Sequence, residues 1–352
     1  MRIALIHNRL IHRGGLETRL FSYIDEFRSR GHSVSLVVSK ISPDITLPDD
    51  VEIIKVNLSY IPKLFRDYWL SRSIGRLHLT ESFDFTLSLA RTPYQSAVLA
   101  PGNHLGFLKA IDRNHRGLKD RLDIHIERKS FETCRLILAA STMMKEELVT
   151  LYGLPESKIR VLFPPTDVRR FNREVKNRRD DYRQRFNCSP EKKTCAFVSV
   201  SHGRKGLPLL LEVFAQLRNE PYELLVAGEA RMGAMPENVK YLGYLKETEQ
   251  LYAAADAMLL PAIYEPFGQV VSESLLCGTP VALSHMVGAR QIITPSEGLV
   301  ISGFEVDTWV KAVRDICSRP FYPNPDLAAL HRLSVQDHVS AMLGYWEEVK
   351  NV

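Results

Sequence analysis

Two glutamates eight positions apart, Glu265 and Glu273, are the residues most suited to chemistry in this chain. They flank the tripeptide PFG at 266–268, within the stretch YEPFGQVVSESLLCG. A carboxylate can accept hydrogen bonds from the neighbouring hydroxyls of a ribose or another polyol. The alternative is that both are ordinary surface charges. The PFG turn between a strand and a capped helix favours chemistry.

The elements around the two glutamates predict how they are held. An apolar run of strand length, AMLLPA, ends shortly before Glu265, and helical spacing begins at Gln269. Gly278 followed by Pro280 is typical of a helix end. In an open α/β sheet, ligands bind at such strand-to-helix junctions. The backbone N–H groups at the predicted helix start suit an anion or a sugar hydroxyl.

A second candidate is the pair Arg204 and Lys205 in the loop SHGRKG, between a strand predicted at 194–200 and a helix that starts at Leu207. A diphosphate needs positive charge and backbone donors together, and this loop supplies both. An exposed Arg-Lys pair is usually only surface, but the flanking glycines favour binding. The chain contains no Asp-x-Asp, the usual carboxylate grip on a metal-bound diphosphate. We therefore expect a metal-free site without a cofactor.

The EPFG-x4-Glu stretch resembles the Glu-x7-Glu motif of the retaining glycosyltransferases of family four, which have the two-domain GT-B fold. The segments GGLE, GRKG and a helix at 141–152 also stand in the order of that family. The resemblance implies that Glu273 holds the nucleotide ribose and that Glu265 lies beside the donor sugar. It also implies that Arg204 and Lys205 hold the donor pyrophosphate.

The same resemblance implies donor contacts in the first half. There, a glycine pair follows the first strand, and His104 or Asn103 follows a later one. On the residues alone, the glycines could equally form a tight turn and His104 could be a capping or surface group. The expected catalytic residues are Glu265, Arg204, Lys205 and His104, with no metal ligand. The expected donor-binding residues are Gly14, Gly15, Asn103, Gly203, Gly228, Glu229, Pro266, Phe267, Gly268, Gln269 and Glu273.

Strands and helices alternate along both halves, which predicts an α/β fold with parallel, doubly wound sheets. The resemblance implies two Rossmann-like domains, 1–163 for the acceptor and 164–333 for the nucleotide sugar, facing each other across a cleft. A terminal helix at 334–352 is expected to cross back to the first domain. The hinge reads Pro-Pro-Thr-Asp, which departs from the family's usual Pro-Asn-Gly-Val-Asp.

Composition narrows the class of protein. The 352 residues are 45% hydrophobic and 25% charged, which is typical of a soluble globular protein. No apolar run approaches the roughly 18 residues of a membrane span. The five cysteines lack zinc-type spacing. We expect reduced, mostly buried thiols and a cytoplasmic protein.

The net charge of +5 is unevenly spread. Ile61 to Arg135 carries 13 Lys and Arg against 8 Asp and Glu, and Val168 to Lys193 carries 10 against 4. Basic segments with aromatic residues can lie on an anionic membrane, whereas ordinary helices would bury their apolar faces. We expect an acidic or lipid-linked acceptor and peripheral contact with the inner face of the cytoplasmic membrane. Nucleic acid is not an expected partner.

The resemblance implies a retaining enzyme that moves a hexose from a nucleotide sugar to a hydroxyl of a glycan or lipid-linked glycan, and the missing Asp-x-Asp adds the expectation that it needs no metal. A UDP-sugar is the expected donor, and the lipopolysaccharide core is a candidate acceptor. Two alternatives stay open at this point. One is a nucleotide-sugar-binding protein without transfer activity, and the other is a nucleotide-sugar epimerase on the same fold.

Overall fold

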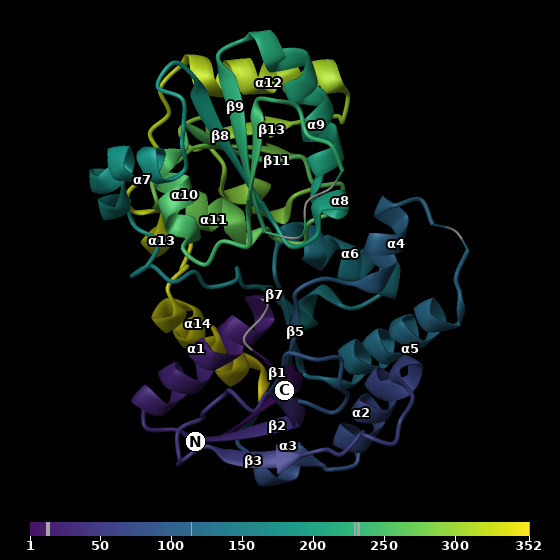
Figure 1. The fold of residues 1–352 in the computed structure, drawn as a ribbon. Helices are drawn as coiled ribbons and strands as arrows, with labels where there is room; N and C mark the ends of the chain where they lie inside the picture. The colour runs from purple at the N-terminus through teal and green to yellow at the C-terminus, as the bar shows by residue number, and fades with distance from the viewer. Residues whose placement is uncertain (12–14, 114, 229, 231–232, 352) are drawn as a thin grey trace. The chain divides into compact units, whose positions relative to one another are not determined.

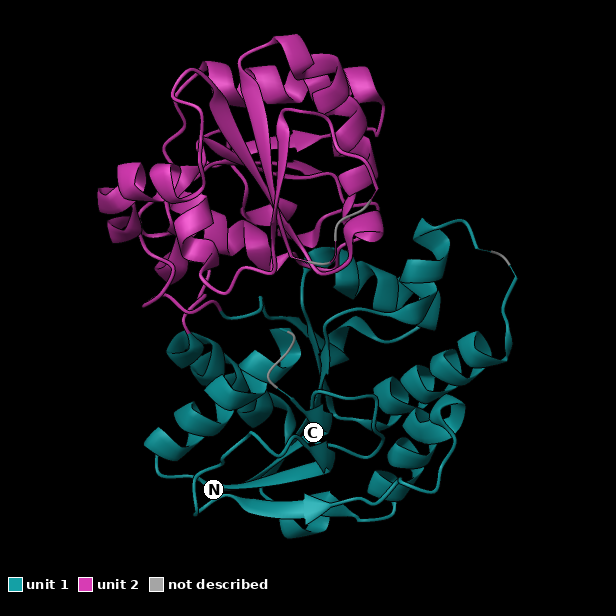
Figure 2. Cartoon of the chain, viewed as in Figure 1, with its two compact units in different colours: residues 1–165, 335–352 teal, residues 166–334 magenta. Residues whose placement is uncertain are grey.

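The computed structural model describes residues 1–11, 15–113, 115–228, 230 and 233–351. The chain divides into two compact units, which Figure 2 colours separately. The first unit comprises Met1–Pro165 and Val335–Val352, and the second comprises Thr166–Ser334. The second unit is therefore inserted into the first.

A parallel sheet forms the centre of the first unit (Figure 1). Its strands in the described part of the chain are β1 (Arg2–Leu10), β2 (Ser33–Ile41), β3 (Glu52–Lys55), β4 (Phe85–Ser88), β5 (Ala97–Ala100), β6 (Leu136–Ala139) and β7 (Ile159–Val161). Their order is β3-β2-β1-β4-β5-β6-β7, and every pair is parallel. The order reverses between β1 and β4, as in a doubly wound sheet.

Helices cover both faces of this sheet, because alternate residues of each strand point to opposite sides. Ile3 and Leu5 of β1 pack in the core that contains α1 (Gly15–Ser29) and α14 (Val335–Val349). Ala4 and Ile6 pack in the core that contains α2 (Arg66–Gly75). The remaining helices of this unit are α3 (Leu79–Ser82), α4 (His104–Ala110), α5 (Leu118–Thr133) and α6 (Thr142–Tyr152), with 3-10 turns η1 (Lys63–Phe65) and η2 (Glu156–Lys158).

The terminal helix α14 is anchored by a buried histidine. His338 Nε2 lies 2.7 Å from the Tyr23 hydroxyl of α1, and His338 Nδ1 lies 2.8 Å from the Phe163 carbonyl oxygen. Burial lowers the pKa of His338 to about 3, so the imidazole is neutral at physiological pH. Val339, Met342 and Trp346 of α14 complete the core over α1.

A second parallel sheet organises the second unit. Its order among the described residues is β10-β9-β8-β11-β12-β13, with the reversal between β8 and β11. The strands are β8 (Lys193–Ser199), β9 (Tyr222–Gly228), β10 (Val239–Gly243), β11 (Ala257–Leu260), β12 (Val281–Ser284) and β13 (Gly298–Ile301). The helices are α7 (Arg179–Arg185), α8 (His202–Lys205), α9 (Leu207–Gln216), α10 (Thr248–Ala254), α11 (Gln269–Leu276), α12 (Val306–Ser318) and α13 (Leu327–Leu330), with 3-10 turns η3 (Arg173–Arg178), η4 (Leu217–Asn219) and η5 (Gly288–Ile292).

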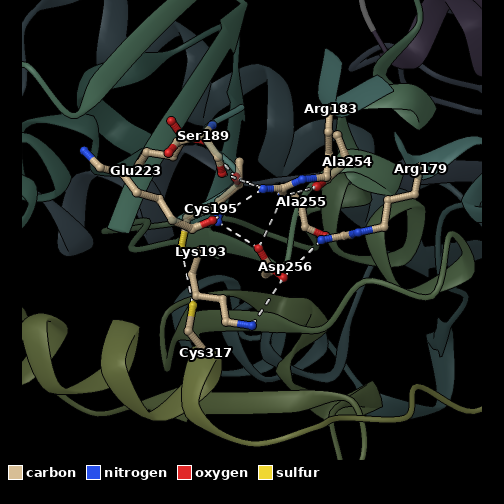
Figure 3. Close-up of polar contacts among 12 residues, drawn as sticks. Arg179, Arg183, Ser189, Lys193, Cys195, Glu223, Ala254, Ala255, Asp256 and Cys317 are labelled. Carbon is tan, nitrogen blue, oxygen red and sulfur yellow. Dashed lines mark hydrogen bonds and ion pairs between the residues drawn. The ribbon is translucent and has the colours of Figure 1, made fainter. Parts of the chain in front are cut away.

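Two arginines of the basic segment 168–193, Arg179 and Arg183, form hydrogen bonds within the second unit (Figure 3). Arg179 Nη1 donates to the carbonyl oxygens of Ala253 and Ala255 at the end of α10, at 2.9 and 2.7 Å. Arg179 Nη2 lies 3.0 Å from Asp256 Oδ1, and Arg183 also donates to the end of α10. Cations at the C-terminus of a helix satisfy its last carbonyls and its dipole. These charges therefore stabilise the fold.

The predicted alternation of strands and helices is confirmed with one adjustment. The helix expected at 141–152 spans Thr142–Tyr152, and Ser141 caps it by accepting from the Met144 N–H at 3.2 Å. The terminal helix, expected within 334–352, spans Val335–Val349. The predicted loop 201–206 instead contains the one-turn helix α8. The basic stretch at 61–79 forms η1 and α2, whose Leu70 and Ile74 are buried, so this helix does bury its apolar face.

The state of the cysteines and the length and hydrophobicity of the helices can be compared with what the composition predicts. All five cysteines are free thiols; Cys134, Cys195 and Cys277 are buried, and Cys188 and Cys317 are partly buried. None of the helices formed by the described residues is both long and apolar enough to cross a bilayer.

Candidate functional site

The loops after β8 and β11, on either side of the reversal in the second sheet, hold the predicted cations and Glu265. Gly206 allows these loops to meet, with a φ of +88° and a position where an added Cβ would lie 2.1 Å from the Pro261 carbonyl oxygen. The Ile263 N–H donates to the Arg204 carbonyl at 3.0 Å. The backbone that carries Arg204 is therefore joined directly to the loop before Glu265.

Both cations are paired with one carboxylate oxygen. Glu265 Oε2 lies 3.2 Å from Arg204 Nη1 and 3.6 Å from Lys205 Nζ. Arg204 Nη1 also donates to the Tyr264 carbonyl oxygen at 2.5 Å. The side chains of Glu265 and Lys205 are only 12% and 11% exposed, so solvent screens this pair less than it screens a surface pair.

The backbone of Glu265 is fixed independently of its side chain. Its N–H donates to the Met286 carbonyl at 3.0 Å, and its carbonyl accepts from the Gly288 N–H at 2.8 Å. Gly268 is the N-cap residue of α11, with a φ of +96°. A Cβ there would lie 3.2 Å from both Glu265 Cγ and Val287 Cγ1, so glycine permits close packing behind the carboxylate.

The rest of the predicted PFG segment lies as the sequence indicated. Phe267 is buried, and its carbonyl accepts from the Ala289 N–H at 2.8 Å. Pro266 is partly exposed, and Gln269 is the first residue of α11. Gly278 follows the helix with a φ of +75°, as predicted for its end.

Glu273 lies within α11 and has a partner that the sequence did not predict. Its Oε2 accepts a hydrogen bond of 2.9 Å from the hydroxyl of Tyr252 in α10. Burial raises the pKa of Glu273, and the Tyr252 hydrogen bond and the charge of Lys205 oppose that rise. Burial and the neighbouring carboxylate raise the pKa of Tyr252 well above its ordinary value. Tyr252 was detectable as a tyrosine in a Leu- and Ala-rich helix, since a buried hydroxyl needs a partner.

The other donor-binding candidates in the second unit are Gly203, Gly228 and Glu229. Gly228 ends β9 with a φ of +125°, and a Cβ there would lie 1.8 Å from the Ser199 carbonyl oxygen of β8. Gly203 lies in α8, where an added Cβ would meet no atom within 4 Å. Glu229 lies outside the described residues. Gly228 thus brings the ends of β8 and β9 together beside the cations.

In the first unit, Asn103 is used as a helix cap. Its Oδ1 accepts from the Gly106 N–H at 2.5 Å, and its Nδ2 donates to Glu147 Oε2 at 2.6 Å. Gly15 is the first residue of α1, and Gly14 lies outside the described residues. The expected donor contacts of these residues stay predictions.

His104 is held at both its side chain and its backbone. Its Nε2 lies 2.9 Å from Asp120 Oδ1, and its N–H donates to Glu127 Oε2 at 2.8 Å. The His104 hydrogen bond lowers the pKa of Asp120, whereas burial raises the pKa of Glu127 against the charge of Arg91. Arg91 Nε lies 2.9 Å from Glu127 Oε1. Sequence reasoning missed these partners, although Asp120 and Glu127 share one face of α5 by their spacing.

The structure of the second unit therefore gathers Arg204, Lys205 and Glu265 at the reversal of its sheet. Lys205 acts electrostatically on Glu273 as well, which ties the two predicted carboxylates to one cation. Among the described residues, no group of three or more His, Cys, Asp and Glu could hold a metal ion. The arrangement offers cations for an anion and carboxylates for hydroxyl groups.

Comparisons with known proteins follow this division. The family model for glycosyltransferase family 4 matches residues 13–170, and the model for glycosyl transferases group 1 matches residues 178–329. A probable transglycosylase of Burkholderia thailandensis is 36% identical over 305 residues, which are 86% of this chain and 82% of that protein. A D-inositol 3-phosphate glycosyltransferase of Rhodococcus opacus is 28% identical over 54% of this chain and 46% of its own length.

Solved structures show the same fold. WaaG, a glycosyltransferase involved in lipopolysaccharide biosynthesis, matches with a TM-score of 0.77 at 19% identity, over 96% of this chain and 94% of its own. Anabaena HepE in complex with UDP-glucose matches with a TM-score of 0.70 at 16% identity, over 100% of both chains. The two parallel-sheet units correspond to the Rossmann-like domains of the GT-B fold. Together, the family models and the relative of 36% identity place this chain among the family 4 glycosyltransferases.

Proposed function

We propose that this chain is a retaining glycosyltransferase that transfers a hexose from a UDP-sugar to a hydroxyl of a glycan or lipid-linked glycan. The observation that carries the proposal is the partly buried cluster in which Arg204 and Lys205 share Glu265. It lies at the sheet reversal, where open α/β sheets bind ligands. HepE, which has the same fold, has been solved with UDP-glucose.

The nucleotide ribose is assigned to Glu273. A carboxylate held by the Tyr252 hydroxyl at one oxygen keeps lone pairs for the two ribose hydroxyls. Burial penalises the ionised form, and ribose hydroxyls that donate to it would offset part of that penalty. The site is thus better suited to a polyol than to an anion at this position.

The donor diphosphate is assigned to Arg204 and Lys205. Negative charge develops on the leaving diphosphate as the glycosidic bond breaks, and fixed cations stabilise it. Without donor, the single charge of Glu265 balances only one of the two cations, so the cluster keeps a net charge of about +1 that a diphosphate can use. Glu265 is assigned to the donor sugar, and its fixed backbone gives it a defined position.

A panel of nucleotide sugars tests the proposal. We expect one UDP-sugar to raise the melting temperature and to be hydrolysed slowly without acceptor. Hydrolysis should survive a chelator, and the anomeric configuration should be retained by NMR. A chain that binds none of the panel would contradict the proposal. An inverted product or a lost activity in chelator would contradict retention or metal independence alone.

We also propose a glycan acceptor presented at an anionic membrane surface, with the lipopolysaccharide core as the first candidate to test. The charge excess of Ile61 to Arg135 supports this, as do the partly exposed Trp69 and Leu64 beside the cations of α2. Cations near an anionic surface gain about 1 kcal/mol each, and salt screens that gain. Co-sedimentation that is equal with neutral and anionic vesicles would rule out the membrane contact.

A further inference from the structure

A hollow of about 620 Å³ lies in the first unit, beside the outer face of α5. The described residues that line it are His115, Arg116, Arg121, Ile124, His125 and Arg128. Three of these are arginines, two are histidines, and none of the described lining residues carries a carboxylate. Its size falls in the range of pockets that take a small organic ligand, about 300–1,000 Å³.

The spacing of charges along α5 explains why this hollow is basic. Arg121, Ile124, His125 and Arg128 recur at three- and four-residue intervals, so they share one face of the helix. Three of the four acids of the same helix recur on a neighbouring face, which is turned inward, and the fourth, Glu132, is exposed near the end of the helix. These buried acids are Asp120, Asp123 and Glu127.

The buried acids already have other cationic partners. Asp120 pairs with His104 at 2.9 Å and with Arg113 at 3.1 Å. Arg91 lies 2.9 Å from Glu127 and 3.7 Å from Asp123. These three acids are therefore not available to the arginines on the outer face of α5.

The arginines of the hollow lack such partners. Within the part of the chain that the structure describes, none of Arg116, Arg121 and Arg128 forms an ion pair, and all three are exposed. The guanidinium of Arg128 lies 5.7 Å from the ring centroid of Tyr152, a contact that leaves its charge unneutralised. Like charges gathered on a concave surface focus a positive potential and attract anions.

We infer that this hollow, which we call the α5 groove, binds phosphate groups and takes the phosphate-bearing part of the acceptor. Arginine presents a planar fork of N–H donors that matches phosphate oxygens, and the two imidazoles offer further donors. His125 also contacts the ring of Tyr68 from α2, with centroids 6.4 Å apart. That the bound phosphate belongs to the acceptor rests on the proposed function, whereas phosphate binding by the groove does not depend on it.

The test follows the side-chain signals of His115 and His125 in the full chain by long-range ¹H–¹⁵N NMR. Inorganic pyrophosphate is added at low ionic strength and constant pH, and His115→Gln and His125→Gln assign the signals. We expect both signals to move in a saturable way. The triple variant Arg116→Gln, Arg121→Gln, Arg128→Gln should weaken this response at least about tenfold.

Two further variants separate recognition from folding and from overall charge. The corresponding triple lysine variant keeps the charge but loses the forks, so it should bind with an affinity between those of the wild type and the glutamine variant. A matched control, Arg218→Gln with Lys311→Gln and Arg319→Gln, removes three exposed cations from the second unit and should leave the titration unchanged. Three results would overturn the inference. The histidine signals of the wild type do not shift with pyrophosphate, the glutamine variant responds as strongly as the wild type, or the control variant loses as much of the response as the glutamine variant does.

Calorimetry with UDP on the same samples keeps the two proposals apart. UDP binding without a response of His115 and His125 overturns the groove and leaves the proposed function. A response of both histidines without UDP binding supports the groove and contradicts the proposed function. Vesicles then identify the source of the phosphate. If the glutamine variant no longer binds phosphatidylglycerol vesicles, the phosphate is a lipid head group. If it binds them as the wild type does, the phosphate belongs to a soluble glycan.

Discussion

The hydroxyl of Tyr252 lies 2.9 Å from Glu273 Oε2 and donates a hydrogen bond from α10 to α11. This bond holds the carboxylate that we assign to the nucleotide ribose. We expect Tyr252→Phe to weaken UDP binding by about 1 kcal/mol, roughly fivefold, because the carboxylate loses the donor that orients it. Calorimetry measures the change. Tyr244→Phe, at an exposed position, is the control, and unchanged UDP affinity in a folded Tyr252→Phe protein would remove Tyr252 from the site.

We expect the ionised form of Glu273 to lower the free energy of unfolding, although the same residue contributes to ligand binding. Burial raises its pKa above the ordinary 4.5, so the folded chain loses stability as the pH rises through that raised pKa. Glutamine does not titrate. We therefore expect Glu273→Gln to melt at a higher temperature than the wild type at pH 8. Each kcal/mol gained in the free energy of unfolding should raise the melting temperature by roughly 2–4 °C, and the difference should shrink as the pH falls toward 4.5.

The same substitution should have the opposite effect on the ligand. Glu273→Gln should lower UDP affinity about tenfold, and Glu273→Ala should lose roughly 1.5–3 kcal/mol for each hydrogen bond removed. A melting difference that does not change with pH would show that Glu273 is not the group that titrates.

Arg204→Gln and Lys205→Gln should each depress donor hydrolysis about 10²–10³-fold, because the charge they face develops in the transition state. Either cation remains to pair with Glu265 when the other is lost, so we expect the fold to survive. Steady-state hydrolysis and a melting curve are measured together, with Arg218→Gln as the control. Wild-type turnover in both variants would show that the leaving group is stabilised elsewhere.

Two glycines of one segment should respond in opposite ways. Gly206→Ala places a Cβ 2.1 Å from the Pro261 carbonyl at a φ of +88°, so we expect a loss of stability of several kcal/mol. Gly203→Ala meets no atom within 4 Å and should melt at or above the wild-type temperature. If Gly203→Ala nevertheless lowers UDP affinity, the methyl group must meet the ligand. Equal melting temperatures for the two variants would contradict the role of Gly206.

Local patterns predicted much of the fold, because many elements here carry their own signals. The helix at 142–152 combines a serine cap, apolar periodicity and Gly153 in the left-handed region, and its limits are as predicted. The carboxylates, the cations and their loops were also predicted, since a strand, a turn glycine and a capped helix follow one another in each segment. One-turn α8 was missed because four residues carry too little periodicity to distinguish a helix from a loop.

The partners of the site residues could not be predicted in the same way. Tyr252 reaches Glu273 from another helix, and Arg91 reaches Glu127 from another loop. Such contacts depend on packing between elements, and spacing along the chain does not report it. The α5 groove was not predicted either, although the interleaved acids and bases of α5 fall on two helical faces by their spacing.

The insertion of the second unit into the first has a consequence for synthesis. The Thr166 N–H donates to the Leu333 carbonyl oxygen at 2.8 Å, so the two ends of the inserted unit meet and that unit is complete once Ser334 has left the ribosome. Helix α14, whose Trp346 and Met342 close the core of the first unit, emerges only afterwards. Nascent chains usually finish their N-terminal domain first. Here the first unit cannot complete its core until α14 has been synthesised, so an apolar face of its sheet stays uncovered while the second unit is made.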